Sequence, residues 1–342
     1  MARISELAAD RLKWADEQLA DCHLCPRKCR VNRLDGERGW CGAGMNARYF
    51  SEFVHYGEES DLVPSHTLYL TGCNMKCLFC HTADDRKDKP SKALTPSLLK
   101  SIVRRGRKEG ARNLNILGGE PFVNLPALLK LIAAVTDLPP VVWNTNLYCS
   151  SESLQMVRGI PAVYLPDLKF GNTKCAERIC GANDYWDIVR RRLKELYEEG
   201  AERIIIRHLI LPGHVECCTL PVLEWIAKNI PDVQVSLKSD YLLMPAARED
   251  ADLGRFLTPA EVYKAEAVAR DLGLSLAARR QAGEIRGRIR KKSPRLRSFE
   301  RNTDAEIIIS PSGEIYLRQP TRKMITLGKS LATGSGRKKV PK

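Results

Sequence analysis

Short apolar runs rich in β-branched residues alternate along this chain with longer segments that mix apolar and charged positions. Strands separated by helix-length segments are typical of βαβ units on a parallel sheet. The pattern predicts six strands, over residues 66–71, 113–117, 140–145, 162–168, 203–211 and 233–237. Helices are predicted over residues 95–108, 126–136, 184–199, 220–229 and 259–272.

Six such units predict an α/β fold, a partial (β/α)6 TIM-like barrel over residues 61–275. An N-terminal helix and a cysteine-rich segment are expected over 1–60. Residues 276–342 are expected to hold a basic linker, a β-hairpin over 305–318 with its turn at 311–313, and a disordered tail. In a parallel barrel the chemistry lies at the carboxyl ends of the strands.

Three cysteines follow the first predicted strand, in the run Thr-Gly-Cys-Asn-Met-Lys-Cys-Leu-Phe-Cys. Cys73, Cys77 and Cys80 offer three thiolates, which suit a 4Fe-4S cluster and leave its fourth iron open for a small molecule. The alternative is part of a zinc site with His81 as the nearest further ligand. Structural zinc sites usually pair two Cys-x2-Cys-like knuckles, and this favours the cluster.

A second motif, Gly118-Gly119-Glu120-Pro121, follows the second predicted strand. The glycines permit a sharp exit from the strand and a close approach of the backbone to a ligand. Glu120 supplies an acceptor for an ammonium group. Placed one helix-length segment after the cysteine triplet, this turn makes the chain resemble the radical SAM enzymes.

The resemblance implies cofactors and a reaction. In that superfamily the triplet binds the cluster, and the Gly-Gly-Glu-Pro turn binds the amino group of S-adenosylmethionine. An electron from the reduced cluster cleaves the cofactor into methionine and a 5'-deoxyadenosyl radical, which removes a hydrogen atom from a substrate. Phe79 holds the aromatic position of the cysteine loop, where it is expected to pack on the adenine or to shield the iron. A reductant such as flavodoxin or ferredoxin is expected as a partner.

Three further strand ends resemble pyruvate formate-lyase-activating enzyme. Asn144 and Leu147 stand where that family has an aspartate and a glycine, and a neutral amide holds a cation less well than a carboxylate. Asp167 and Lys169 match the family's Asp-Leu-Lys, and Lys169 is expected to bind the carboxylate of the cofactor. His208 ends the fifth strand, where the family also has a histidine. The alternative for His208 is a structural role.

Four more cysteines precede the triplet, in Cys22-x2-Cys25-Pro-x2-Cys29 and Gly-Trp-Cys41-Gly. They can close around a metal without help from the rest of the chain. Zinc and a second iron-sulfur cluster both accept four thiolates, so the spacing leaves both open, beside thiols without a metal, and we favour the cluster. This pattern resembles a branch of iron-sulfur proteins related to pyruvate formate-lyase-activating enzyme.

The remaining five cysteines show no spacing typical of a metal site. Free cysteine is commonly a small buried apolar residue, and this is expected for Cys149, Cys175, Cys180, Cys217 and Cys218. Cys175 and Cys180 are the first exceptions to consider, because they lie shortly after a predicted strand end.

Composition bounds the class of protein. A chain of 342 residues that is 44% hydrophobic can bury one large domain with small appendages. No apolar run of about 18 residues occurs, so no membrane span is expected. The N-terminus lacks the apolar centre of a secretion signal, and a cytoplasmic location follows. There the twelve cysteines would stay reduced, as cluster ligands and free thiols.

The resemblance leaves the substrate open. A protein or peptide client, as in glycyl-radical activation, is one expectation. RNA is a second, because the net charge is +14 and ten Lys or Arg residues lie between Arg279 and Arg301. Residues 286–292 include no aromatic side chain to stack on bases, which favours a solvated linker or a surface for an acidic protein. A non-catalytic electron-transfer or scaffold protein is a third, but it would not explain the Gly-Gly-Glu-Pro turn.

Overall fold

The computed structural model describes residues 4–57, 59–83 and 90–278, and the backbone of three strands over 306–309, 314–319 and 322–329. The predicted basic linker, the hairpin turn at 311–313 and the C-terminal tail lie outside the described residues.

Six parallel strands form the frame of the molecule: β2 (Ser65–Leu70), β4 (Asn113–Leu117), β5 (Val141–Thr145), β6 (Val163–Pro166), β7 (Ile205–Leu209) and β8 (Gln234–Lys238). The first four are neighbours in one sheet, and β7 pairs with β8. Two parallel bridges, Tyr164 to Ile204 and Asp167 to Arg207, join β6 to β7. The strands therefore follow one another in chain order, and the predicted partial barrel is confirmed.

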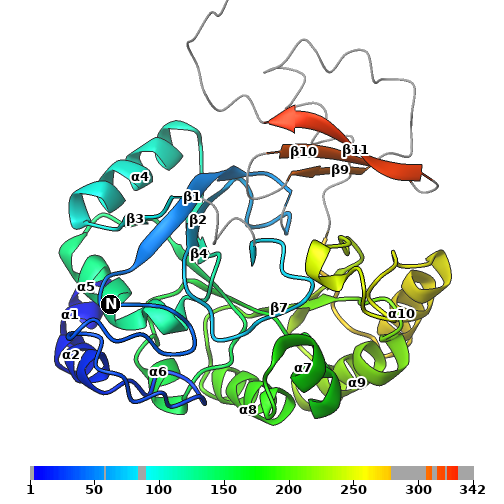
Figure 1. Cartoon of the computed structure of the whole chain (residues 1–342), viewed down its shortest axis with the longest axis horizontal. Coiled ribbons are helices and arrows are strands. Elements are labelled where there is room, and N and C mark those ends of the chain that lie inside the picture. Colours follow the sequence, from blue (N-terminus) through cyan, green and yellow to red (C-terminus); the bar gives the residue numbers. More distant parts are fainter. Residues whose placement is uncertain are drawn as a thin grey trace, which may run out of the picture.

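Helices cover the outside of these strands, as Figure 1 shows. They are α4 (Pro96–Lys108), α5 (Leu125–Ala134), α6 (Ser151–Gln155), α7 (Thr173–Cys180), α8 (Tyr185–Glu198), α9 (Leu220–Asn229) and α10 (Pro259–Asp271). Local sequence starts several of them. The side chain of Thr95 accepts a hydrogen bond from the Leu98 N–H at the start of α4, and Thr258 forms a capping box with Glu261 at the start of α10.

The core lies between the strands and the helices. The strands β2, β5 and β6 are buried along their whole length, as expected when helices cover a parallel sheet. Trp143 and Phe122 meet edge to face, with ring centroids 5.6 Å apart, and Phe170 and Tyr185 meet in the same way at 5.6 Å. Trp143 lies in β5, and Phe122 and Phe170 follow β4 and β6, so these buried rings belong to the strand ends that carry the predicted site residues.

The expected N-terminal helix is present as two helices, and several other elements were not predicted. The strand β1 (Arg48–His55) pairs antiparallel with β2, and β3 (Lys92–Ala93) pairs with β1 at the sheet edge. Most of β1 is half-buried, so it lacks the continuous apolar run that marks the central strands. The helices α1 (Ile4–Ala9) and α2 (Leu12–Ala20) pack against α5. The helix α7 and a π-helical turn, η2 (Val215–Thr219), also escaped prediction.

The C-terminal strands form a separate three-stranded sheet. The predicted hairpin is present, with β9 (Glu306–Ile309) antiparallel to β10 (Glu314–Gln319). A third strand, β11 (Arg322–Lys329), pairs with β10 and was not predicted.

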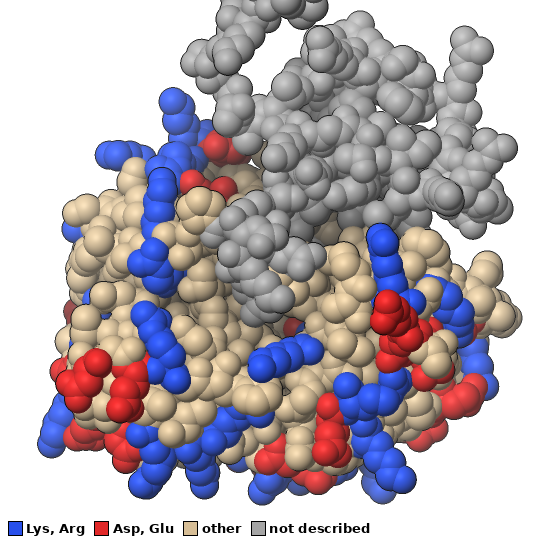
Figure 2. Space-filling model, viewed as in Figure 1, with Lys and Arg blue, Asp and Glu red and all other residues tan. Residues whose placement is uncertain are grey.

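The surface of the described part mixes charges of both signs. Figure 2 shows Lys and Arg side chains interspersed with Asp and Glu over the visible face. Among the described helices, none combines the length and the apolar character that a membrane crossing needs.

Candidate active site

The Gly-Gly-Glu turn after β4 is held against the exit of β2. The Gly119 N–H donates to the Leu70 carbonyl at 2.7 Å, and the Glu120 N–H donates to the Gly72 carbonyl at 2.8 Å. A Cβ atom on Gly119 would lie 1.8 Å from the Gly72 carbonyl oxygen, and one on Gly118, where φ is +107°, would lie 2.5 Å from the Leu70 nitrogen. Both glycines therefore permit close contact between two backbone segments at the strand exit, and the predicted close approach to a ligand stays a prediction.

The carboxylate of Glu120 lies at the centre of the strand ends and is 1% exposed. It accepts hydrogen bonds from the Phe122 N–H at 3.0 Å, the Thr145 hydroxyl at 2.6 Å and the Asn146 N–H at 2.7 Å. Burial raises the pKa of Glu120 to about 7, although these hydrogen bonds act in the opposite direction. The charge of this group is therefore sensitive to a nearby cation at neutral pH.

The end of β5 and the turn after it hold Asn144 and Leu147, the two residues that differ from those of pyruvate formate-lyase-activating enzyme. Asn144 is buried, and its Nδ2 has no hydrogen-bond partner in the described part of the chain. Leu147 has φ of 55°, the left-handed conformation that glycine adopts most readily, and its N–H donates to the Thr145 hydroxyl at 2.9 Å. The turn thus keeps a glycine-like backbone and leaves a buried amide donor unsatisfied.

The first cysteine of the triplet has hydrogen-bond donors beside its sulfur atom, and the last lies beside a hydroxyl that donates to the Gly118 carbonyl at 3.1 Å. The Met75 N–H donates to Cys73 Sγ at 3.4 Å, and Asn146 Nδ2 lies 3.8 Å from the same sulfur. Cys80 Sγ lies 3.5 Å from the Thr82 hydroxyl. Hydrogen bonds to the sulfur ligands are one way in which a protein sets the reduction potential of an iron-sulfur cluster.

The middle of the cysteine loop is bound to the end of α7. The Lys76 N–H donates to the Cys180 carbonyl and the Leu78 N–H to the Ile179 carbonyl, both at 3.0 Å. A hydrogen bond with Cys180, together with burial, raises the pKa of Cys77 well above its usual value. The position of Cys77 therefore depends on α7.

Lys169 and Asp167 form an ion pair at the end of β6, with 2.5 Å between Nζ and Oδ2. Burial would lower the pKa of Lys169, but the negative charge of Asp167 and the neighbouring Cys77 raise it above its usual value. A charged ammonium thus lies beside the cysteine loop. Phe79 is 5% exposed, and its ring centroid lies 6.2 Å from that of Phe170.

His208 is completely buried, and both of its ring nitrogens are engaged within the protein. Nδ1 donates to the Leu168 carbonyl at 2.7 Å, so Nε2 accepts from the Thr219 hydroxyl at 2.9 Å. Burial lowers the pKa of His208 to about 4, which keeps the ring neutral. This geometry matches the structural alternative for His208, because it ties the ends of β6 and β7 together.

The four N-terminal cysteines, Cys22, Cys25, Cys29 and Cys41, line one small pocket. The buried guanidinium of Arg33 donates to Cys22 Sγ at 3.1 Å and to Cys41 Sγ at 3.7 Å. Burial raises the pKa of Cys25 to about 11. A cation beside thiols favours their ionised, metal-binding form.

This N-terminal pocket abuts the cysteine loop. The Cys73 N–H donates to the Cys41 carbonyl at 3.1 Å, and Arg27 Nε donates to the Asn74 carbonyl at 2.8 Å. The Arg27 guanidinium also stacks 4.0 Å from the ring centroid of Trp40. The two cysteine groups predicted separately from the sequence are therefore neighbours.

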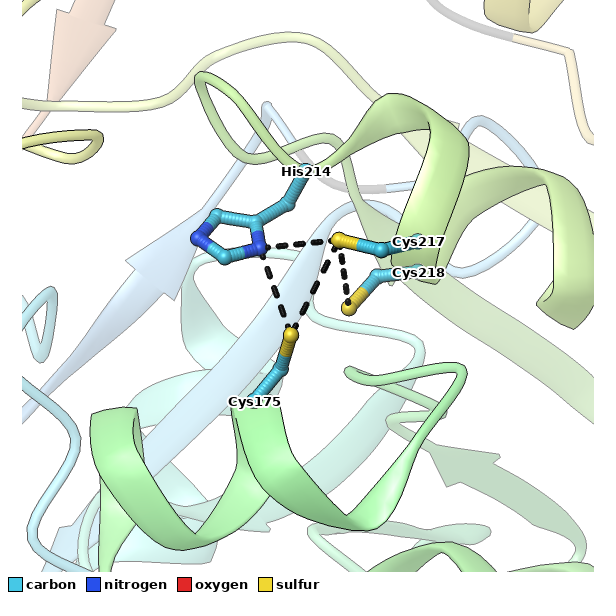
Figure 3. A group of neighbouring side chains, drawn as sticks. All are labelled: Cys175, His214, Cys217 and Cys218. Atoms are coloured by element: carbon cyan, nitrogen blue, oxygen red, sulfur yellow. Dashed lines mark hydrogen bonds between the residues drawn. The ribbon is translucent and has the colours of Figure 1, made fainter.

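A third cysteine group was missed. The ligand atoms of four side chains lie within 4.8 Å of one another, those of Cys175, His214, Cys217 and Cys218. Figure 3 shows these side chains pointing toward one another. Cys175, Cys217 and Cys218 were expected to be small buried apolar residues, with Cys175 as a first exception, and the structure brings them together with a histidine. The run His214-x2-Cys217-Cys218 was the only sequence signal, and Cys175 comes from a different βα unit.

The side chains at the strand ends fit the cofactors that the resemblance implied. Three thiols in one loop suit an iron-sulfur cluster. The Glu120 carboxylate and the Lys169 ammonium offer opposite charges for an amino acid moiety, and Asn144 Nδ2 is a buried donor without a partner.

Comparison with known proteins gives the family. Residues 67–226 match the model described as the radical SAM superfamily. A relative from Methanocaldococcus jannaschii, "Uncharacterized protein MJ0674", is 37% identical over 273 residues, which cover 78% of this chain and 79% of the relative. A "Probable GTP 3',8-cyclase" from Methanococcus aeolicus is 24% identical over 149 residues, 42% of this chain and 48% of that protein.

Two solved structures illustrate the more distant similarities. Streptococcus suis SuiB bound to S-adenosylmethionine is 16% identical, with a TM-score of 0.48, and covers 74% of this chain and 60% of its own. A domain of pyruvate-formate lyase-activating enzyme from Bacteroides vulgatus is 14% identical, with a TM-score of 0.34. The match covers 53% of this chain and 89% of that domain. On its family match and the motifs at its strand ends, this chain belongs to the radical SAM superfamily.

Proposed function

We propose that this protein is a radical enzyme that holds a 4Fe-4S cluster on Cys73, Cys77 and Cys80 and acts on a protein or peptide client. When bound, the cluster supplies the electron that cleaves S-adenosylmethionine into methionine and a 5'-deoxyadenosyl radical. The observation that carries the proposal is the buried Glu120 carboxylate, which three donors hold at the meeting point of β4, β5 and the cysteine loop.

The residues around Glu120 divide the binding of S-adenosylmethionine among them. Glu120 binds the ammonium group, and Lys169 binds the carboxylate and returns to Asp167 when the cofactor leaves. Asn144 Nδ2 donates to a polar atom of the cofactor, because nothing in the described part of the chain uses that donor. Phe79 and Phe170 exclude water from the reacting atoms.

Removal of one cysteine tests this function. We expect Cys77→Ala to abolish formation of 5'-deoxyadenosine by the anaerobically reconstituted, chemically reduced protein, and to lower its iron content. Cys149→Ala is the control, because Cys149 is a completely buried cysteine outside the triplet. Formation of 5'-deoxyadenosine at the wild-type rate by Cys77→Ala would refute the assignment.

We further propose that Cys22, Cys25, Cys29 and Cys41 hold a second iron-sulfur cluster through which electrons enter. Contact between the Cys41 carbonyl and the Cys73 N–H supports this role, and so does the partial exposure of Cys29, which a flavodoxin or ferredoxin can approach. Zinc is the alternative ion. Iron, sulfide and zinc per chain in the wild type and in Cys22→Ala/Cys25→Ala decide between them, and a loss of zinc alone would overturn the cluster.

The client is proposed on chemical grounds. Asn144 and Leu147 differ from the glycyl-radical-activating family beside the cofactor, which favours another protein or peptide modification. Incubation of the reduced protein with candidate clients, followed by electron paramagnetic resonance and peptide mass measurement, tests this. A glycyl radical signal would identify activation, and a mass change without it would identify modification of another kind.

RNA is the second candidate, and one observation favours it. Lys and Arg exceed Asp and Glu by 13 over residues 279–342 but by only 1 over residues 1–278. Nearly all the excess charge thus lies in the C-terminal part, where phosphates would be attracted. Binding to tRNA that weakens steeply with salt and disappears when residues 279–342 are removed would support RNA, and no binding at low salt would exclude it.

A further inference from the structure

Two of the loops at the barrel mouth bring four metal-ligating side chains together. Cys175 lies in the first turn of α7, which follows β6, whereas His214, Cys217 and Cys218 lie in and before η2, which follows β7. Figure 3 shows Cys175 facing the other three residues across the gap between these elements. Neither the predicted cluster nor the N-terminal pocket uses any of the four.

The separations between the ligand atoms match a single ion. Cys175 Sγ lies 3.7 Å from Cys217 Sγ and 3.5 Å from His214 Nδ1, and Cys217 Sγ lies 3.2 Å from His214 Nδ1 and 3.9 Å from Cys218 Sγ. In a tetrahedral zinc site, bonds of about 2.3 Å to sulfur and about 2.0 Å to nitrogen give edges of about 3.8 Å between sulfurs and about 3.5 Å between sulfur and nitrogen. Four of the six edges of such a tetrahedron are thus matched to within about 0.3 Å, and all four ligand atoms lie within 4.8 Å of one another.

A cluster fits this group less well than one ion. The thiolates of an iron-sulfur cluster bind different irons, so they lie farther apart than two ligands of the same metal. Three sulfurs and one imidazole nitrogen are also a common ligand set of structural zinc, which closes its fourth coordination position with protein.

Residues around the group support thiolates and orient the imidazole. Asn172 Nδ2 lies 3.2 Å from Cys175 Sγ and 3.6 Å from Cys218 Sγ, where it can donate to either. The Arg178 guanidinium lies 3.0 Å from His214 Nε2 and compensates part of the negative charge of three thiolates. The Asp252 carboxylate is 3.5 Å from the same nitrogen.

With the metal on Nδ1, the proton of the neutral imidazole lies on Nε2. A carboxylate is a suitable acceptor for that proton, and a carboxylate behind a metal-bound histidine is a common arrangement. Asp252 takes this position, and Arg178 then turns its donors to Asp250 and Asp252, both of which it already contacts.

From these contacts we propose that Cys175, His214, Cys217 and Cys218 form a structural zinc site that joins the β6–α7 and β7–α9 connections. The zinc site would also affect the cysteine loop, because both contact α7. The last turn of α7 accepts hydrogen bonds from the cysteine loop on both sides of Cys77. An ion at the first turn of α7 therefore fixes the helix that positions the active-site loop.

Metal analysis of the full chain tests the site. The protein is produced without oxygen in zinc-supplemented medium, in the Cys22→Ala/Cys25→Ala background so that the N-terminal cysteines do not contribute zinc. We expect about one zinc per chain. We expect Cys175→Ser/Cys217→Ser to lose it, whereas the control Cys149→Ser keeps it. Equal zinc in both variants, or none in the parent, would overturn the site.

A spectroscopic measurement covers the case in which the double variant fails to fold. Zinc absorption spectroscopy of the parent protein should show three sulfur neighbours at about 2.3 Å and one nitrogen at about 2.0 Å. A shell of oxygen and nitrogen atoms, or of four sulfurs, would contradict the assignment.

The outcome is independent of the radical chemistry. Replacement of Cys73, Cys77 and Cys80 by alanine should leave the zinc content unchanged while it removes cluster iron. If zinc remains but the wild type forms no 5'-deoxyadenosine, the proposed function fails and the zinc site stands. If the wild type forms 5'-deoxyadenosine but binds no zinc, the proposed function stands and the zinc site fails.

Discussion

Glu120→Gln is the sharpest test of how this site binds S-adenosylmethionine. A hydrogen bond to a charged group contributes about 1.5–3 kcal/mol, so loss of the carboxylate charge should weaken binding about 10- to 150-fold at a pH where Glu120 is ionised. Glutamine keeps the size of the side chain but turns one amide donor towards the donors of Phe122, Thr145 and Asn146. The binding constant is measured by equilibrium dialysis on reconstituted, iron-matched protein.

The pH dependence of that binding carries a second signature. Burial raises the pKa of Glu120 to about 7, so the ionised fraction rises about eightfold between about pH 6 and about pH 7.5. If the ammonium of the cofactor needs the ionised carboxylate, the wild-type affinity should rise by about the same factor over this range. Above about pH 7.5 the amino group of the ligand begins to lose its own proton, which sets the upper limit of the experiment.

The matched control is Thr145→Val, which removes the 2.6 Å hydrogen bond that favours the charged form of Glu120. Its binding curve should shift to higher pH, whereas Glu120→Gln should show no rise with pH at all. Wild-type affinity that stays constant from about pH 6 to about pH 7.5, or a Gln variant that keeps the rise, would refute the reasoning about Glu120.

The raised pKa of Glu120 also makes the stability of the cofactor-free protein depend on pH. The folded-state pKa of Glu120, about 7, lies above the ordinary value of 4.5. The protonated carboxyl therefore contributes stability that is fully present below about pH 4.5 and is lost as pH rises through about 7. Denaturant unfolding at these pH values should show this loss in the wild type and not in Glu120→Gln.

Two further changes test the frame that supports the site. Glu59→Gln should destabilise the barrel by about 3–5 kcal/mol in urea unfolding, because the buried Glu59 accepts two hydrogen bonds from Arg207, at 2.9 and 2.7 Å, and the change removes the carboxylate charge that faces this guanidinium. A loss below about 1 kcal/mol would show that the pair contributes no more than an exposed one. Thr258→Ala should cost about 1 kcal/mol in the same assay, since it removes the capping box with Glu261, and an unchanged midpoint would show that the cap does not stabilise α10.

The sequence by itself predicted those features whose residues lie close together in the chain. The six parallel strands were predicted because they are largely buried on both faces and so leave apolar runs, which β1, half-buried at the sheet edge, does not have. The cysteine triplet and the Gly-Gly-Glu-Pro turn were recognised because their residues are adjacent in the chain. The left-handed backbone at Leu147 could not be predicted, because leucine rarely adopts it.

Only the tertiary structure decided which distant side chains meet. His208 became a buried link because Leu168 and Thr219, from two other segments, occupy both its nitrogens. Cys175 joins His214, Cys217 and Cys218 because β6 and β7 are neighbours and their connections emerge at the same end of the barrel. Sequence spacing reports ligands within one loop, whereas the distance between two loops is set by the packing of the strands that carry them.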